Sequence, residues 1–279
     1  MLIDNHQHFW QIGKHGHEWP TADLAPIYRD FGVDDLLQES STTKLAGTVV
    51  VQSQPSDADT DWLLQLASQH QLIKGIVGWV DFESSSAVSR LSSLAHHPKF
   101  KGVRPMLQSL PDDNYILRDS VLSALNAMTE LNLRFDALVF TRHLGAIAVL
   151  AHRWPQLQIV IDHAAKPPIA QKNTQATQLW QIAMSRVAEF PNVQCKLSGL
   201  FTEMEADQSR DDAAPYVEHV LNVFGPERVM WGSDWPVLKL RNSYNEWHEW
   251  TMKHIAHLVA SQQAAIMGGN AIRFYNLTV

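Results

Sequence analysis

The sequence predicts an α/β fold, namely a closed (β/α)8 TIM barrel that forms a single domain over residues 1–279. Eight short runs with strand-like composition recur along the chain, and most intervals between them carry apolar residues at helical spacing. Such alternation favours a parallel sheet with crossover helices. Eight repeats, in a chain slightly longer than the ~250 residues typical of the closed form, favour the barrel over an open doubly wound sheet.

The predicted strands are distributed over the whole chain. In order they are LIDNHQHF at 2–9, GTVVVQS at 47–53, IVGWVDF at 76–82, KGVRPML at 101–107, LRFDALVF at 133–140, QIVIDHA at 158–164, VQCKLSG at 193–199 and RVMWGSDW at 228–235. No Gly-x-Gly-x-x-Gly or Walker-type loop follows any of them, so neither a dinucleotide nor a nucleoside triphosphate is indicated.

The intervals between the strands show the spacing of a buried helix face. The clearest sets are Trp62, Leu63 and Leu66; Val88, Leu91 and Leu94; Val121, Leu125 and Met128; and Leu144, Ile147 and Ala151. The stretch from Gln11 to Arg29 lacks this pattern and directly follows the first strand. Because the loops after the strands form the active face of a barrel, we expect this stretch to reach over the pocket.

Composition and charge exclude several classes of partner. The formal charge is −7, and lysines and arginines do not gather into a stripe that would bind nucleic acid or an anionic membrane. Apolar runs are too short for a membrane span, and the start of the chain lacks the pattern of a secretion signal. Cys195 is the only cysteine, so no intrachain disulfide can form. We therefore expect a cytoplasmic protein.

Polar and ionisable residues stand near the C-terminal end of every predicted strand. They are His6, His8, Gln52, Gln54, Asp81, Arg104, Asp136, His163, Lys196 and Asp234. Alternation along a strand places His6 and His8 on one inward face, and the same count places Ile161 with His163, and Gly232 with Asp234, inward as well. An inert scaffold does not need such groups at the mouth of a barrel, which is where barrel enzymes hold their catalytic residues.

These residues and the segments around them resemble the amidohydrolase superfamily, of the amidohydrolase 2 type. Its signature is His-x-His after the first strand, a later His and an Asp after the eighth, which correspond here to His6, His8, His163 and Asp234. The resemblance is more specific to the fuconolactonase-like sugar-lactonase branch. It rests on DNHQHFW, EWPTADLAPIYRDF, GTVVVQSQPSDADTDWLL, VGWVDFES, KGVRPMLQ, IDHAAKP, CKLSGL and WGSDWPV, which run nearly end to end.

The chain departs from the wider superfamily at the fourth and fifth strands. Many members bridge two metal ions with a Lys or Glu on strand four and use a His on strand five, where strand order here places Arg104 and Asp136. A guanidinium has no lone pair for a metal, so Arg104 cannot be a ligand. We expect at most one divalent ion, zinc or manganese, held by His6, His8 and Asp234. Whether the reaction needs it is left open.

The resemblance implies hydrolysis of a small sugar lactone, such as an L-fucono- or L-rhamnonolactone. Lactone hydrolysis needs a nucleophilic water, a stabilised oxyanion and a proton for the leaving alkoxide. We assign the base to Asp234, while His6, His8 and His163 either bind the cation or donate to the oxyanion. We expect Arg104 to bind the substrate, and Lys166 and Lys196 to contact the oxyanion or the leaving oxygen. The substrate hydroxyls are expected to bind Gln52, Gln54, Asp81 and Asp136. The face of the sugar ring is expected to pack on Trp10, Trp19, Trp79 and Trp235.

The sequence leaves three alternative functions open. One is a decarboxylase, since a branch of the superfamily uses a similar His/His/Asp site as a lyase. Another is a lactonase acting on a muconolactone, although Arg104 and the lysines are too few to decide for an anionic substrate. The third is a binding protein without turnover. The sequence does not give the stereochemistry or ring size of the substrate, or the oligomeric state, for which a homodimer is one option.

Overall fold

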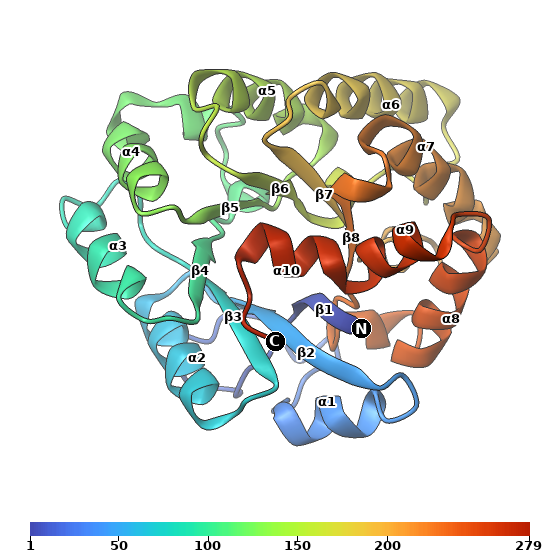
Figure 1. The fold of residues 1–279 in the computed structure, drawn as a ribbon, viewed down its shortest axis with the longest axis horizontal. Coiled ribbons are helices and arrows are strands. Elements are labelled where there is room, and N and C mark those ends of the chain that lie inside the picture. Colours follow the sequence, from blue (N-terminus) through green and yellow to red (C-terminus); the bar gives the residue numbers. More distant parts are fainter.

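The computed structural model describes residues 1–279 and shows eight parallel strands in the order β1 to β8 around a barrel (Figure 1). The strands are β1 Leu2–Gln7, β2 Leu45–Val51, β3 Ile73–Gly78, β4 Phe100–Val103, β5 Arg134–Ala137, β6 Ile159–Ile161, β7 Val193–Leu197 and β8 Val229–Trp231. The barrel closes between β8 and β1, where the His8 amide donates to the Trp235 carbonyl at 2.8 Å and the Asp234 amide donates to the His6 carbonyl at 2.7 Å. The predicted (β/α)8 barrel is confirmed.

Seven helices lie outside the barrel and connect successive strands, and three more follow β8 (Figure 1). They are α1 Val33–Glu39, α2 Asp57–Gln69, α3 Ala87–Ala95, α4 Leu122–Glu130, α5 Leu144–Arg153, α6 Thr174–Ala188, α7 Ala214–Phe224, α8 Tyr244–His254, α9 Ala260–Ala264 and α10 Asn270–Tyr275. The four helical patterns read from the sequence fall on α2, α3, α4 and α5, except that Val121 directly precedes α4. No helix combines the length and apolar character that crossing a membrane requires.

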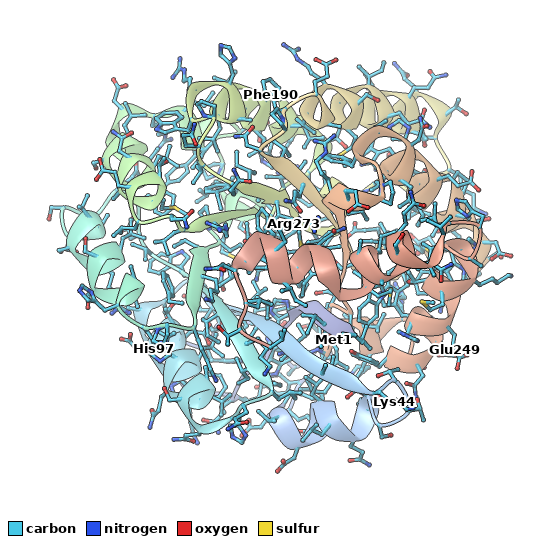
Figure 2. The ribbon with its side chains drawn as sticks, in the orientation of Figure 1. Met1, Lys44, His97, Phe190, Glu249 and Arg273 are labelled. Carbon is cyan, nitrogen blue, oxygen red and sulfur yellow. The ribbon has the colours of Figure 1, made fainter.

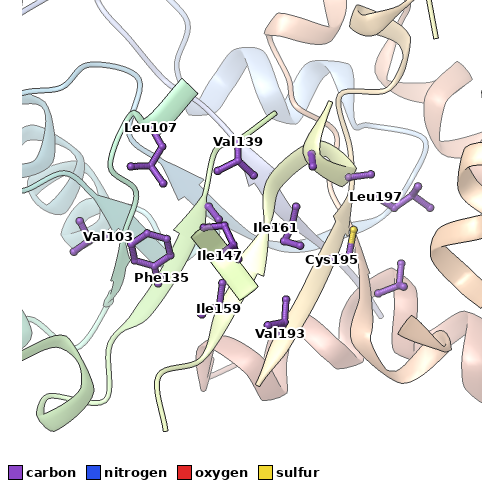
Figure 3. Packing of buried hydrophobic residues seen from close by; sticks show 14 of the residues in the cluster. Val103, Leu107, Phe135, Val139, Ile147, Ile159, Ile161, Val193, Cys195 and Leu197 are labelled. Carbon is purple, nitrogen blue, oxygen red and sulfur yellow. The ribbon is translucent and has the colours of Figure 1, made fainter. Parts of the chain in front are cut away.

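Most of the apolar core lies between the strands and the helix layer. Ile159 and Ile161 on β6 pack there with Cys195 on β7 and with Ile147 on α5 (Figure 3). Side chains fill the spaces between the strands and the surrounding helices (Figure 2). The prediction that Ile161 faces the barrel interior is wrong, because the inward side chain of this strand is its neighbour Val160.

A second, smaller apolar cluster lies inside the barrel at the N-terminal ends of the strands. Ile3, Val49 and Val160 meet Phe274 and Tyr275 there, which come from α10. This helix lies across the middle of the ring of strands in Figure 1, so it covers one end of the barrel. The opposite end of the barrel, at the C-terminal ends of the strands, is therefore open for a site.

Candidate active site at the C-terminal ends of the strands

A cavity of about 410 Å³ opens where the strands end. Only a few apolar side chains line it, among them Trp19 and Leu138. The polar lining comes from loops after many different strands and consists of His8, Glu18, Ser53, Gln54, Arg104, Gln108, Ser109, His163, Lys166, Thr202, Glu203 and Asp234. The stretch after β1 reaches the cavity through Glu18 and Trp19, as its position in the sequence predicts.

The backbone after β6 leaves strand geometry at once, and this brings His163 into the cavity. Residues 163 to 166 all have positive φ, with values of 53°, 48°, 57° and 50°. Without this turn, alternation would point His163 away from the barrel, since Val160 lies in the interior cluster and Asp162 contacts Lys196 inside. Non-glycine residues in this region cost about 1–2 kcal/mol each, and such strain is typical of functional sites.

Gly199, just after β7, leaves room for the side chains of His163 and Asp234. Its φ is +63°, and a Cβ at this position would stand 2.5 Å from His163 Nδ1 and 3.2 Å from Asp234 Oδ2. Any side chain would therefore displace His163. Asp234 itself has a φ of 59°, so both the histidine and the carboxylate are held by left-handed backbone.

Three histidines surround the carboxylate of Asp234. Asp234 Oδ1 lies 3.4 Å from Nε2 of His8 and 3.8 Å from Nε2 of both His6 and His163. All four residues are buried. His6 lies beneath the cavity and does not line it, while the other three do.

The electrostatic environment fixes the charge of this cluster. Burial alone would raise the pKa of Asp234, but the adjacent His163 and His8 side chains outweigh it and hold that pKa below its usual value. Burial lowers the pKa of His163 well below its usual value, and burial together with Lys196 does the same for His6. At neutral pH the site therefore holds an ionised Asp234 beside neutral His6 and His163.

Hydrogen bonds determine which ring nitrogens face Asp234. The Nδ1–H of His8 donates to the Val51 carbonyl at 2.8 Å, because a carbonyl can only accept. This leaves His8 Nε2, in the neutral ring, as a lone pair that faces a carboxylate. His163 Nδ1 lies 2.9 Å from Ser198 Oγ, and when this hydroxyl donates, the ring carries its N–H on Nε2.

A buried ion cluster lies below the cavity. Lys196 Nζ is 2.5 Å from Asp136 Oδ2, 3.0 Å from Asp162 Oδ1 and 3.1 Å from His6 Nδ1. Tyr275, from the helix that covers the far end of the barrel, donates its hydroxyl to Asp136 at 2.7 Å. Burial raises the pKa of Asp136 to about 6. This cluster holds the underside of His6 in place.

Arg104 connects the ion cluster to the cavity. One guanidinium nitrogen donates to the Gln52 carbonyl at 2.5 Å, and another lies 3.7 Å from Asp162 Oδ2 and 3.5 Å from His6 Nε2. The side chain is almost fully buried but still lines the cavity. It can therefore present one edge of its fork to a bound molecule.

The structure separates the predicted substrate-binding residues into two groups. Trp19, Gln54, Arg104 and Lys166 line the cavity, whereas Gln52, Asp81, Asp136, Lys196, Trp10, Trp79 and Trp235 do not.

The second group contacts protein atoms instead. Gln52 donates to the Arg104 carbonyl at 3.0 Å, and the exposed Asp81 accepts the Glu83 amide at 3.0 Å. Trp235 is fully buried, with its ring centroid 5.3 Å from that of Phe31. We assign these residues no direct contact with substrate.

Several residues that sequence reasoning missed belong to the site. Asp162 contacts His6, Arg104 and Lys196, and it directly precedes His163. Glu18, Gln108 and Glu203 line the cavity from loops. Asp162 could have been found from strand alternation, because it follows the inward Val160 by two positions. The loop residues carry no such signal, since a loop path has no period.

His6, His8 and Asp234 fit one divalent cation. Their ligand atoms lie within 4.8 Å of one another. The lone pair of His8 Nε2 and the carboxylate of Asp234 face each other at 3.4 Å, close to the ~3.4 Å expected between two ligands of a tetrahedral ion with bonds of about 2.1 Å. Arg104, 3.5 Å from His6 Nε2, adds a positive charge that makes a second ion unfavourable.

Comparisons with known proteins agree with this geometry. A family described as amidohydrolase matches residues 3–277. The chain is 45% identical to an L-fucono-1,5-lactonase of Burkholderia ambifaria, over 99% of this chain and 95% of that protein. It is 33% identical to an L-fucono-1,5-lactonase of Burkholderia multivorans, over 99% and 96%. An amidohydrolase from Burkholderia multivorans, solved with bound zinc and with bound HEPES, superposes with a TM-score of 0.94 at 30% identity, over the full length of both chains.

Proposed function

The chain belongs to the amidohydrolase family, and we propose that it is a lactonase that opens a sugar lactone such as L-fucono-1,5-lactone to its acid. The full-length similarity to two L-fucono-1,5-lactonases supports the reaction class. The cavity supports it independently, because it holds an ionised carboxylate, imidazoles and a guanidinium together with many hydroxyl-binding groups. The resemblance seen in the sequence is thereby confirmed.

Asp234 is the general base of this proposal. Its carboxylate is ionised, faces the cavity and lies where a water beside a lactone carbonyl can be bound. The lowered pKa makes it a weak base. Lactones are reactive esters, so the attack needs less assistance than that on an amide.

Arg104, His163 and Lys166 supply the hydrogen-bond donors. When the Ser198 hydroxyl donates to His163 Nδ1, His163 Nε2 carries its N–H and is a neutral donor at the cavity. Arg104 and Lys166, although each is paired with a carboxylate, can donate further hydrogen bonds from the cavity wall to the developing negative charge on the carbonyl and leaving oxygens. Lys196 has no such role here, because it is fully buried between Asp136 and Asp162.

A divalent cation would be held by His8 and Asp234 with His6 below them. Such an ion lowers the pKa of a water molecule bound to it and polarises a carbonyl oxygen. We propose zinc or manganese as its identity, and one ion per chain. The proton acceptor and the donors described above come from the chain itself.

Recognition of the sugar falls to the rest of the cavity. Gln108, Ser109 and Thr202 offer donors and acceptors of the kind that hydroxyls need, and Trp19 offers a flat ring beside them. A site built from such partners selects by hydroxyl pattern, since an unmatched hydroxyl leaves a buried polar group without its partner.

The observation that carries this proposal is the placement of Asp234 among three histidines in a polar cavity of a chain similar to two lactonases. A pH-indicator assay over hexono- and 6-deoxyhexonolactones, with and without added divalent metals, tests it. We expect acid release above the spontaneous rate for at least one of them. No release with any lactone, together with carbon dioxide from an aromatic acid, would instead establish a decarboxylase.

A further inference from the structure

An ion pair forms part of the cavity wall away from the histidines. Lys166 Nζ lies 3.1 Å from Glu203 Oε1, and both side chains line the cavity. Their side chains are 21% and 20% exposed, so the pair is largely withdrawn from solvent, unlike ion pairs on the outer surface. In such a setting a charge without a partner acts more strongly on a bound molecule than it does in water.

The backbone holds both members of this pair in place. The Lys166 amide donates to the His163 carbonyl at 2.8 Å, which ends the left-handed turn after β6. The backbone amide of Glu203 donates to the Leu200 carbonyl at 3.1 Å, and the backbone carbonyl of Glu203 accepts the Ala170 amide at 2.9 Å. Neither side chain forms an ion pair with Asp234, although Lys166 is among the charges that lower the pKa of Asp234.

The charges on the lining do not favour an anionic ligand. The lining holds two cations, Arg104 and Lys166, and three carboxylates, Glu18, Glu203 and Asp234. Arg104 is already compensated from below by Asp162 at 3.7 Å, and Lys166 is compensated by Glu203. Both cations on the wall are therefore already paired with a carboxylate, and the three carboxylates of the lining outnumber its two cations.

We propose that Glu203 determines the charge class of the substrate: by neutralising Lys166 it makes the cavity accept neutral polyhydroxy lactones and reject lactones that carry a free carboxylate. This inference rests on the proposed lactonase function and extends it from the reaction to the substrate class. A site can discriminate between two substrates by repelling one as well as by binding the other, and here the unfavourable interaction is between the carboxylates of the lining and a carboxylated lactone.

The test compares two lactones that differ in one group. A hexonolactone is neutral, whereas the hexaric acid monolactone of the same ring configuration carries a carboxylate. We expect Glu203→Gln to raise the ratio of kcat/KM for the carboxylated lactone over the neutral one by about tenfold or more, because Lys166 becomes free to pair with the carboxylate. Adding Lys166→Gln to this variant should remove the gain.

Glu205→Gln is the matched control. Glu205 stands two residues further along the same segment, is exposed and does not line the cavity, yet its replacement changes the net charge equally. Its ratio should match that of the wild type. Lys166→Gln alone should lower the ratio, since Glu203 then faces the substrate unpaired. If Glu203→Gln lowers the rates on both lactones equally, the pair only supports the fold and the inference is wrong.

A binding measurement separates this inference from the lactonase proposal. Calorimetry with two non-hydrolysable lactams, one neutral and one carboxylated, reports charge preference without turnover. If the wild type hydrolyses neither lactone, the proposed function fails, but a shift towards the carboxylated lactam in Glu203→Gln still supports the charge assignment. If the lactonase activity is present and the lactam preference is the same in both proteins, the charge assignment alone is wrong.

Discussion

The imidazole of His163 lies against the bare Cα of Gly199, so close that a Cβ at position 199 would stand 2.5 Å from His163 Nδ1. The two residues follow different strands, β6 and β7, and each has positive φ. The position of the ring therefore depends on the absence of a side chain on the neighbouring strand. It also depends on Ser198, whose hydroxyl lies 2.9 Å from the same nitrogen.

Gly199→Ala should consequently damage the site. The new methyl group must push His163 away from Asp234, and we expect kcat to fall by about 10²-fold, the loss typical of misplacing a catalytic group. Steady-state kinetics and a melting curve check this. Gly145→Ala, on α5 with open space around it, is the control and should leave kcat unchanged. Equal kinetics in the two variants would contradict the proposed role of this contact.

Gln54 holds the loop after β1 over the cavity. Its Oε1 accepts the amides of Glu18 and Trp19 at 2.9 and 3.3 Å, and its Nε2 donates to the Trp19 carbonyl at 2.6 Å. We expect Gln54→Ala to raise KM about tenfold with a smaller change in kcat, because in the proposed function this loop contacts the substrate away from the reacting atoms. Gln65→Ala, at an exposed position of α2, is the control. A loss confined to kcat would argue against a binding role for this loop.

Lys196 is expected to matter for stability more than for chemistry. Replacing it with Met would leave Asp136 and Asp162 buried without their cation, which should lower the free energy of unfolding by about 3–5 kcal/mol. Denaturant unfolding measures this change. Lys172→Met, with a side chain that is 67% exposed, should change it by less than about 1 kcal/mol. A Lys196 variant as stable as the wild type would show that the ion cluster is not needed for the barrel.

The metal content should not exceed one ion per chain. Arg104 and Lys196 both lie beside the His6 ring. A second divalent ion there would therefore meet two fixed positive charges. Elemental analysis of protein purified without chelators measures the stoichiometry, and His8→Asn should lower it. Two ions per chain would mean that a bridging ligand lies elsewhere in the cavity.

The barrel could be predicted because its signals are periodic. Apolar residues at helical spacing mark α2 to α5, and short strand-like runs mark the eight strands, so the topology follows from their alternation. The position of the site followed from the same strand order, since the C-terminal ends of parallel strands all lie at one end of the barrel. His8, His163 and Asp234 were placed together on that basis and do lie together.

The detail of the site could not be predicted because the backbone departs from strand geometry there. Counting every second residue put Ile161 with His163 on the inward face, whereas the left-handed turn at 163 to 166 lets Asp162 and His163 both face the site. Lys196 and Asp136 were correctly expected at strand ends but pair with each other below the cavity. Sequence order does not show whether a polar residue meets substrate or another side chain.

Kinetics of Asp234→Asn test most directly whether Asp234 accepts the proton from the attacking water. The substitution removes the base but almost no volume, so kcat on the best lactone should fall by about 10²-fold or more with little change in melting temperature. The melting curve shows whether the fold survives the change. Turnover close to that of the wild type, in a variant that melts at the same temperature, would contradict the assignment of Asp234 as the base.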